Sequence, residues 1–102
     1  MLATEVNQIL IECDRFAKLI ETENKSIKLL LENPNKEDTN LFLRSNKELI
    51  KLTKWRLEQL ASTLEHVGWW RKKVVNSYIN RILQGFELNQ RVIELLKIKS
   101  ES

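Results

Sequence analysis

The side chains that most often perform catalysis are scarce in this chain and lie far apart. It contains one histidine, His66, and one cysteine, Cys13. Cys13 lies among apolar residues at helical spacing, which favours a buried thiol over a nucleophile because reactive thiolates need a polar setting. His66 has no nearby cysteine or second histidine with which to bind a metal ion. The sequence therefore predicts no catalytic, metal or cofactor site, and a protein that is not an enzyme.

The composition predicts an all-α protein. Only 2 glycines and 1 proline occur among 102 residues, too few for the tight turns of a β-sheet protein. Hydrophobic residues make up 42% and charged residues 30% of the chain, which suits amphipathic helices. No apolar run approaches the roughly 20 residues of a membrane span. With one cysteine and no signal-peptide pattern, we expect a cytoplasmic protein.

Helical periodicity is clearest in a first segment, about residues 4–32. Its apolar residues recur at alternating steps of three and four, as on one face of an amphipathic helix, with Glu23 as the exception. The stripe consists of Val6, Ile9, Cys13, Phe16, Ile20, Glu23, Ile27 and Leu30. Pro34 ends the segment because proline disfavours helix in the residue before it. Three residues after the break offer side-chain oxygens that can cap the next helix: Asn35, Asp38 and Thr39.

Two further helical segments follow, about residues 36–67 and 69–98. The stripe of the second segment consists of Leu43, Asn46, Ile50, Thr53, Leu57, Leu60, Leu64 and Val67. The apolar pattern shifts frame between Val67 and Val75, beside Gly68. Three segments of similar length permit an up-down-up bundle. A single glycine without other turn residues favours, by a small margin, a third segment that continues or bends away. The predicted fold is one all-helical domain: an antiparallel hairpin of the first two segments with a third segment, forming an elongated three-helix bundle or a hairpin with a C-terminal arm.

The most distinctive sequence feature opens the third segment. Aromatic residues beside cations can stack on nucleic-acid bases while neutralising phosphates, or can lie at a membrane surface. They can also bind a protein partner. The structural alternative is that one tryptophan packs at the bend and the cations are solvated. The residues are Trp69, Trp70, Arg71, Lys72 and Lys73.

A partner-binding surface is predicted from apolar residues that the main stripes do not use. Leu52 and Trp55 lie off the stripe of the second segment, where a further helix should cover them: the third segment, a partner or a second copy. Residues 69–99 carry seven Lys and Arg against two Glu, a net charge of +5 that would attract an acidic partner. The candidate residues of the third segment are Phe86, Ile93 and Leu96.

Residues 9–60 resemble the small flagellar export chaperones of the hook–filament junction class. The resemblance lies in an acidic interruption of the first helix, Leu19-Ile20-Glu21-Thr22-Glu23-Asn24, and in an Asn-x-x-Leu element, Asn46-Lys-Glu-Leu49-Ile50. It implies a cytoplasmic chaperone whose C-terminal amphipathic helix grips an aggregation-prone secreted subunit. The leading hypothesis is a non-catalytic module that binds an amphipathic helix of another protein. The alternatives are a nucleic-acid accessory protein using residues 69–99 and a structural homo-oligomer.

Overall fold

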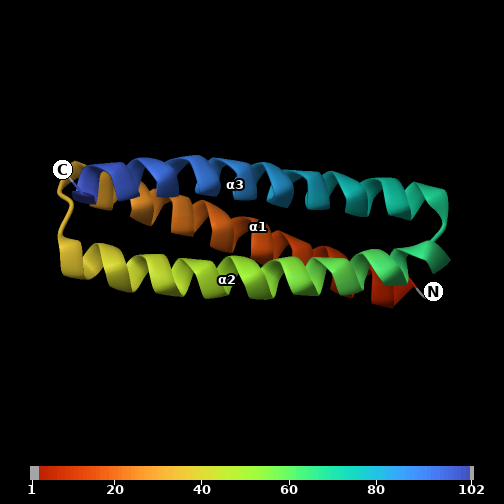
Figure 1. The fold of residues 1–102 in the computed structure, drawn as a ribbon. Helices are drawn as coiled ribbons and strands as arrows, with labels where there is room; N and C mark the ends of the chain where they lie inside the picture. The colour runs from red at the N-terminus through yellow and green to blue at the C-terminus, as the bar shows by residue number, and fades with distance from the viewer. Residues whose placement is uncertain (1–2, 102) are drawn as a thin grey trace.

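The structure, a computed structural model, describes residues 3–101 as three long helices that run up, down and up (Figure 1). They are α1 (Ala3–Glu32), α2 (Lys36–Thr63) and α3 (Trp69–Glu101), with a single 3-10 turn, η1 (Leu64–His66), after α2. The bundle measures 52 × 18 × 16 Å. The all-α, elongated fold with a third helical segment is therefore confirmed.

The two chain reversals have different chemistry. At the first, Oδ1 of Asn35 accepts hydrogen bonds from the backbone amides of Glu37, at 2.9 Å, and Asp38, at 3.3 Å, so the cap predicted at Asn35 is confirmed. At the second, η1 leads to an extended Val67, and the carbonyl of Gly68 accepts the first hydrogen bond of α3, from Lys72, at 2.9 Å.

The second reversal corrects the preference for a third segment that continues or bends away. Within residues 3–101, no residue has a positive φ. A turn built from a 3-10 turn and an extended residue needs no further glycine, asparagine or proline, so the absence of turn residues beside Gly68 did not exclude a full reversal.

All three helices contribute to the core. Helices α1 and α3 run parallel (Figure 1), and they pack more closely with each other than either does with α2. Gly85 allows this approach, because a Cβ there would lie 2.8 Å from Cγ2 of Ile20. The first two helices are antiparallel, as expected, but the closest pairing is α1 with α3. The fully buried side chains include Cys13, Ile20, Ile27, Val75, Ile82 and Leu96.

A layer of three buried asparagines, one from each helix, separates two apolar clusters. Nδ2 of Asn89 donates to Oδ1 of Asn24 and to Oδ1 of Asn46, both at 2.9 Å. Nδ2 of Asn46 donates to Oδ1 of Asn89 at 3.1 Å, and Nδ2 of Asn24 donates to the Gly85 carbonyl at 3.1 Å. Ile20 and Ile27, on either side of Asn24, belong to different clusters. Polar groups that satisfy one another inside a helical core fix its register.

The buried face of α1 departs from the predicted stripe at two places. Asn24, not Glu23, occupies the buried place, and Ala17 is buried where Phe16 was expected. Glu23 is left at the edge, where partial burial raises the pKa of its carboxyl. Ile20 and Ile27 are buried as expected, so the face keeps its direction along α1 and only the choice between two adjacent residues differs.

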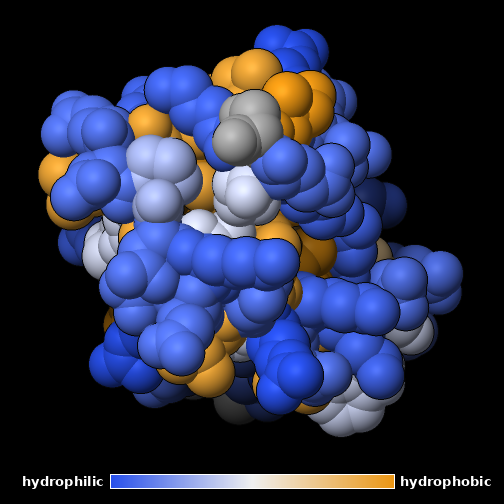
Figure 2. All heavy atoms as spheres, turned by 60° about the vertical axis from the view of Figure 1, so that its left-hand side comes forward, coloured by the Kyte–Doolittle hydropathy of each residue, from blue (hydrophilic) through white to orange (hydrophobic). Residues whose placement is uncertain are grey.

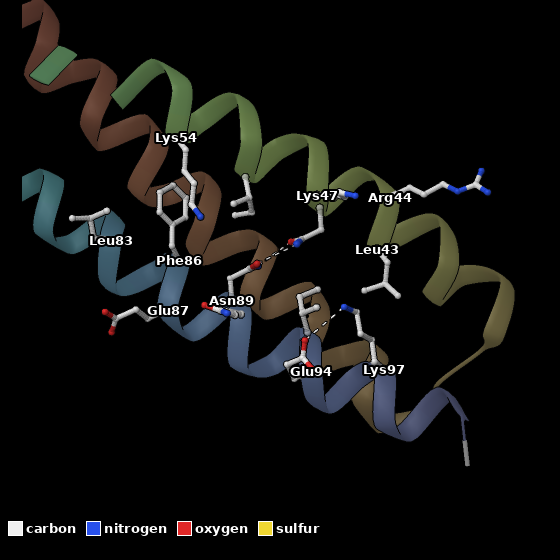
Figure 3. A pocket seen from close by; sticks show the side chains of 14 residues that line it. Leu43, Arg44, Lys47, Lys54, Leu83, Phe86, Glu87, Asn89, Glu94 and Lys97 are labelled. Carbon is white, nitrogen blue, oxygen red and sulfur yellow. Dashed lines mark hydrogen bonds and ion pairs between the residues drawn. The ribbon is translucent and has the colours of Figure 1, made fainter. Parts of the chain in front are cut away.

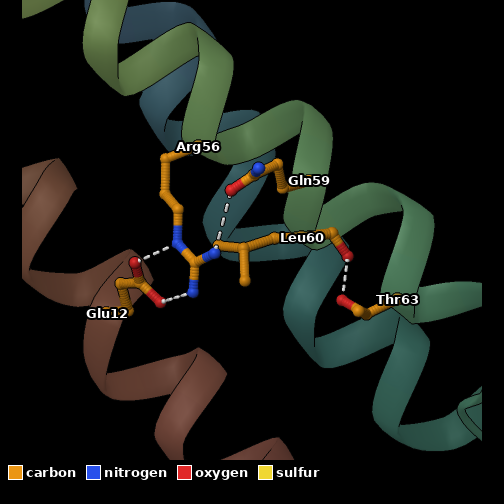
Figure 4. Close-up of polar contacts among 5 residues, drawn as sticks. All are labelled: Glu12, Arg56, Gln59, Leu60 and Thr63. Atoms are coloured by element: carbon orange, nitrogen blue, oxygen red, sulfur yellow. Dashed lines mark hydrogen bonds and ion pairs between the residues drawn. The ribbon is translucent and has the colours of Figure 1, made fainter.

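Ion pairs join α1 to each of the other helices at the surface. Arg56 on α2 holds Glu12 with two nitrogens, its Nη2 lying 3.0 Å from Oε2 (Figure 4). Arg81 on α3 holds Glu21. All four side chains are at least 31% exposed, so solvent screening keeps the contribution of each pair to stability small. Toward the end with the first turn, the surface is mainly hydrophilic with separate apolar patches (Figure 2).

Candidate binding groove between α2 and α3

A groove of about 720 Å³ runs between α2 and α3 (Figure 3). It exists because α2 stands further from α3 than α1 does, so side chains on the facing sides of α2 and α3 do not close over one another. Figure 3 shows Leu43 pointing from α2 toward α3 and Phe86 pointing from α3 toward α2. The apolar lining residues are Leu43, Ile50, Leu83, Phe86 and Ile93.

The groove also reaches the asparagine layer. Asn46 and Asn89 both line it, and the two amides hydrogen bond to each other there. Their bonding capacity is largely used within the layer, so they offer polar surface but few free donors. The groove is thus an apolar trough interrupted by one polar point, which suits a ligand that presents spaced apolar side chains.

The rim of the groove is basic on one side and mixed on the other. Arg44, Lys47 and Lys54 come from α2, and Nζ of Lys54 lies 5.7 Å from the centre of the Phe86 ring. On α3, Lys97 pairs with Glu94 at 3.6 Å. Glu87 is the other rim carboxylate, which leaves four cations against two carboxylates among the lining residues. The α2 rim therefore favours acidic groups on a ligand.

The three partner-binding residues predicted on α3 do not all lie at the groove. Phe86 and Ile93 line the groove, with Phe86 only 7% exposed. Leu96 is fully buried against α1 and the end of the bundle, so its assignment to a partner surface is wrong in this conformation. Leu96 lies on the face of α3 that points into the bundle, whereas Ile93, three residues earlier, lies on the side of α3 nearer α2.

The two predicted candidates on α2 remain uncovered. Leu52 is 60% and Trp55 58% exposed, and neither lines the groove. Of the three expected covers, the third segment is wrong, because both side chains stay more than half exposed within the bundle.

The predicted aromatic and basic cluster lies at the far end of the bundle, at the start of α3. Trp69 and Trp70 stack with ring centres 4.8 Å apart and are 65% and 68% exposed. The alternative in which one tryptophan packs at the bend is therefore wrong. The three following cations, Arg71, Lys72 and Lys73, are exposed.

Sequence reasoning missed the contribution of α2 to the groove and left Leu83 out of the candidate residues. A signal for Leu83 was present, because residues 83, 86, 90, 93 and 97 follow helical spacing along a second face of the third segment. The face of α2 carried no such signal. Leu43 and Ile50 belong to its main stripe, and only the packing shows that they are half-buried.

The thiol of Cys13 is the remaining candidate for chemistry that the sequence raised. Burial, with a smaller effect of Glu12, raises the pKa of Cys13 to about 11, so the expected buried thiol is confirmed. Within residues 3–101, no three His, Cys, Asp or Glu side chains gather as metal ligands would. None of the described helices is both long enough and apolar enough to span a membrane.

Comparisons with known proteins give no evidence about the function, which is therefore argued from the geometry of the structure. The resemblance to flagellar export chaperones rests on the two sequence elements in residues 19–24 and 46–50 and stays a prediction. No family model, curated protein or solved structure matches the chain.

Proposed function

We propose that the protein is a helix-binding module whose α2–α3 groove holds an amphipathic helix of another protein. The observation that carries this proposal is the groove itself, an apolar trough of about 720 Å³ between two long helices. An amphipathic helix recognised in this way inserts apolar side chains at spacings of three and four residues. The lining leucines, isoleucines and Phe86 supply the matching apolar surface.

The charges on the rim select the kind of helix. Arg44, Lys47 and Lys54 form a basic row on α2, so the bound helix should carry acidic residues beside its apolar stripe on that side. Lys54 stands above Phe86, and its contact with the ring would be exchanged for a carboxylate of the ligand.

An export-chaperone role is the more specific form of this proposal. A chaperone of that class shields an amphipathic helix of a secreted subunit, and the groove offers a surface of the required chemistry. The groove involves both α2 and α3, whereas the resemblance places the grip on the C-terminal helix alone.

A designed peptide tests helix binding in place of the natural partner. The probe is a fluorescent peptide of about three heptads, with leucines in the stripe and glutamates beside it. Leu83→Asp should weaken its binding at least about tenfold, because it places a charge in the apolar trough. The control is Leu88→Asp, which changes a residue of similar exposure (40% against 46%) on the same helix but outside the groove.

Charge selectivity is tested with a second pair of variants. Lys47→Glu, on the rim, should weaken binding of the glutamate peptide and strengthen binding of a lysine counterpart, whereas Lys51→Glu, outside the groove, should do neither. Equal effects of the two leucine variants, or no binding of either peptide at millimolar concentration, would refute the groove as a helix site. Self-association that Leu83→Asp abolishes would instead assign the groove to a second copy.

A further inference from the structure

The start of α3 combines exposed aromatic rings with cations that have no acidic partners. Residues 66–86 contain four Lys and Arg and no carboxylate. Arg81 is paired with Glu21, but within residues 3–101 no ion pair involves Arg71, Lys72 or Lys73. Cations at the N-terminal end of a helix are unfavourable, because the helix dipole is positive there. An anion bound at this end would relieve that repulsion.

A hollow of about 460 Å³ lies directly beside the tryptophan pair. Trp70 stacks against Trp69, and the hollow is lined by Trp69 without Trp70. Of the two stacked rings, the hollow therefore presents Trp69 to an aromatic ligand. The other lining residues supply cations, amides and a hydroxyl: Lys72, Lys73, Asn76, Ser77 and Asn80.

We propose that this hollow binds single-stranded nucleic acid. A base stacks on Trp69, and Lys72 and Lys73 neutralise the adjoining phosphates. The amides of Asn76 and Asn80 are placed to hydrogen bond to base edges or sugar. Sequence-tolerant single-strand sites combine the same two elements, an aromatic platform and a cationic path for the backbone.

Two other anionic surfaces fit the hollow less well. A duplex keeps its bases stacked inside, so it would use the lysines but leave the Trp69 ring without a partner. A bilayer surface would accept the tryptophans and lysines, but insertion would desolvate Asn76, Ser77 and Asn80, which line the same hollow. The site shares no lining residue with the α2–α3 groove, so neither proposal depends on the other.

The test uses tryptophan fluorescence in a Trp55→Phe background, so that the signal comes from Trp69 and Trp70 alone. The probes are an oligothymidylate of about eight nucleotides and an abasic strand of equal length. The thymidine strand should quench the emission and bind more tightly than the abasic strand. Trp69→Ala should weaken binding by about five- to a hundredfold, and Trp69→Phe should restore most of it.

The salt dependence separates the role of the lysines. For single strands, the slope of log K against log salt changes by about 0.7 for each phosphate contact, so Lys72→Gln with Lys73→Gln should reduce it by about 1.4. The control is Lys25→Gln with Lys28→Gln, which removes the same charge from exposed positions of α1 and should leave the slope nearly unchanged.

Three results would overturn the proposal. The first is equal binding of the thymidine and abasic strands, and the second is unchanged affinity in Trp69→Ala. The third is binding to vesicles of phosphatidylserine and phosphatidylcholine without binding to the oligonucleotide. Because Trp69, Lys72 and Lys73 are exposed, all variants should keep the wild-type helical circular dichroism, and each is checked in this way.

Discussion

Replacing Asn89 by alanine should destabilise the protein far more than the loss of one polar side chain suggests. Asn89 is the centre of the asparagine layer, and it donates to Asn24 and Asn46 and accepts from Asn46. The substitution removes all three hydrogen bonds. Asn46 borders the groove, where water can replace its lost partner, but Asn24 is 4% exposed and its Oδ1 would stay unsatisfied.

The size of the effect follows from these contacts. Each net hydrogen bond contributes about 1 kcal/mol, and an unsatisfied buried group costs about 1 to 3 kcal/mol. With Asn46 partly rehydrated, we expect Asn89→Ala to lower the free energy of unfolding by about 3 to 4 kcal/mol. For a chain of this length, that corresponds to a fall in Tm of roughly 15 °C. Urea unfolding followed by circular dichroism at 222 nm measures it.

A second variant tests whether the instability comes from unsatisfied polar groups or from the loss of the asparagines themselves. Replacing Asn24, Asn46 and Asn89 together by leucine leaves no asparagine of the layer unsatisfied, and only the Gly85 carbonyl loses a side-chain donor, so the triple variant should be at least as stable as wild type. It should also lose register and populate several oligomers in sedimentation, because nothing then distinguishes one helix alignment from the next. A loss below about 1 kcal/mol in Asn89→Ala, or a triple variant as unstable as the single one, would refute this account.

Three further predictions concern single residues. Gly85→Ala should lower the free energy of unfolding by about 1 to 2 kcal/mol, although alanine has the higher helix propensity, because the new Cβ would lie 2.8 Å from Cγ2 of Ile20. Gly68→Ala, whose new Cβ would have nothing within 4 Å, should change the free energy measured by thermal unfolding by less than about 1 kcal/mol. Glu23→Gln should be slightly more stable than wild type at pH 7. Burial raises the folded-state pKa of Glu23, so ionisation of this carboxyl opposes folding. In urea titrations, the difference in free energy of unfolding between Glu23→Gln and wild type should vanish as the pH falls through that pKa toward 4.5. The pKa of Cys13 is near 9 in the unfolded chain and about 11 in the folded protein. The stability advantage of wild type over Cys13→Ala should therefore shrink by on the order of 2 kcal/mol between pH 8 and 10.5. A difference that stays constant over this range would contradict the effect of burial on the thiol.

Helix content and most of the buried face could be read from the sequence because they depend on local periodicity. The stripe of the second segment predicted five of the six buried residues of α2 and η1: Asn46, Thr53, Leu57, Leu60 and Leu64. It did not predict burial of Thr39, and its members Leu43 and Ile50 are half-buried. The chain reversal after α2 could not be read, because a 3-10 turn with an extended Val67 uses residues that also occur in helices. The pairing of α1 with α3 depends on the close approach at Gly85, which only the packed helices reveal.

The candidate groove was only half predictable for a related reason. Phe86 and Ile93 were identified because the third segment carries more apolar residues than one stripe needs. The α2 side was not, because Leu43 and Ile50 are ordinary stripe residues that stay half-buried only where α3 does not reach them. A groove is a property of the distance between helices, which one helix's sequence does not encode.

The groove and the asparagine layer meet at Asn46, and this couples binding to stability. Asn46 lines the groove and is also the residue through which α2 joins the layer. Along the rest of the groove, α2 faces α3 through side chains that do not close over one another. A bound helix that packed on Leu43 and Ile50 would therefore bury surface that folding leaves half-exposed, and it would hold α2 in register. Binding at a free ligand concentration c should therefore raise the free energy of unfolding by RT ln(1 + c/Kd), and this gain should be smaller in Asn46→Ala, in which the ligand must also position the loosened α2.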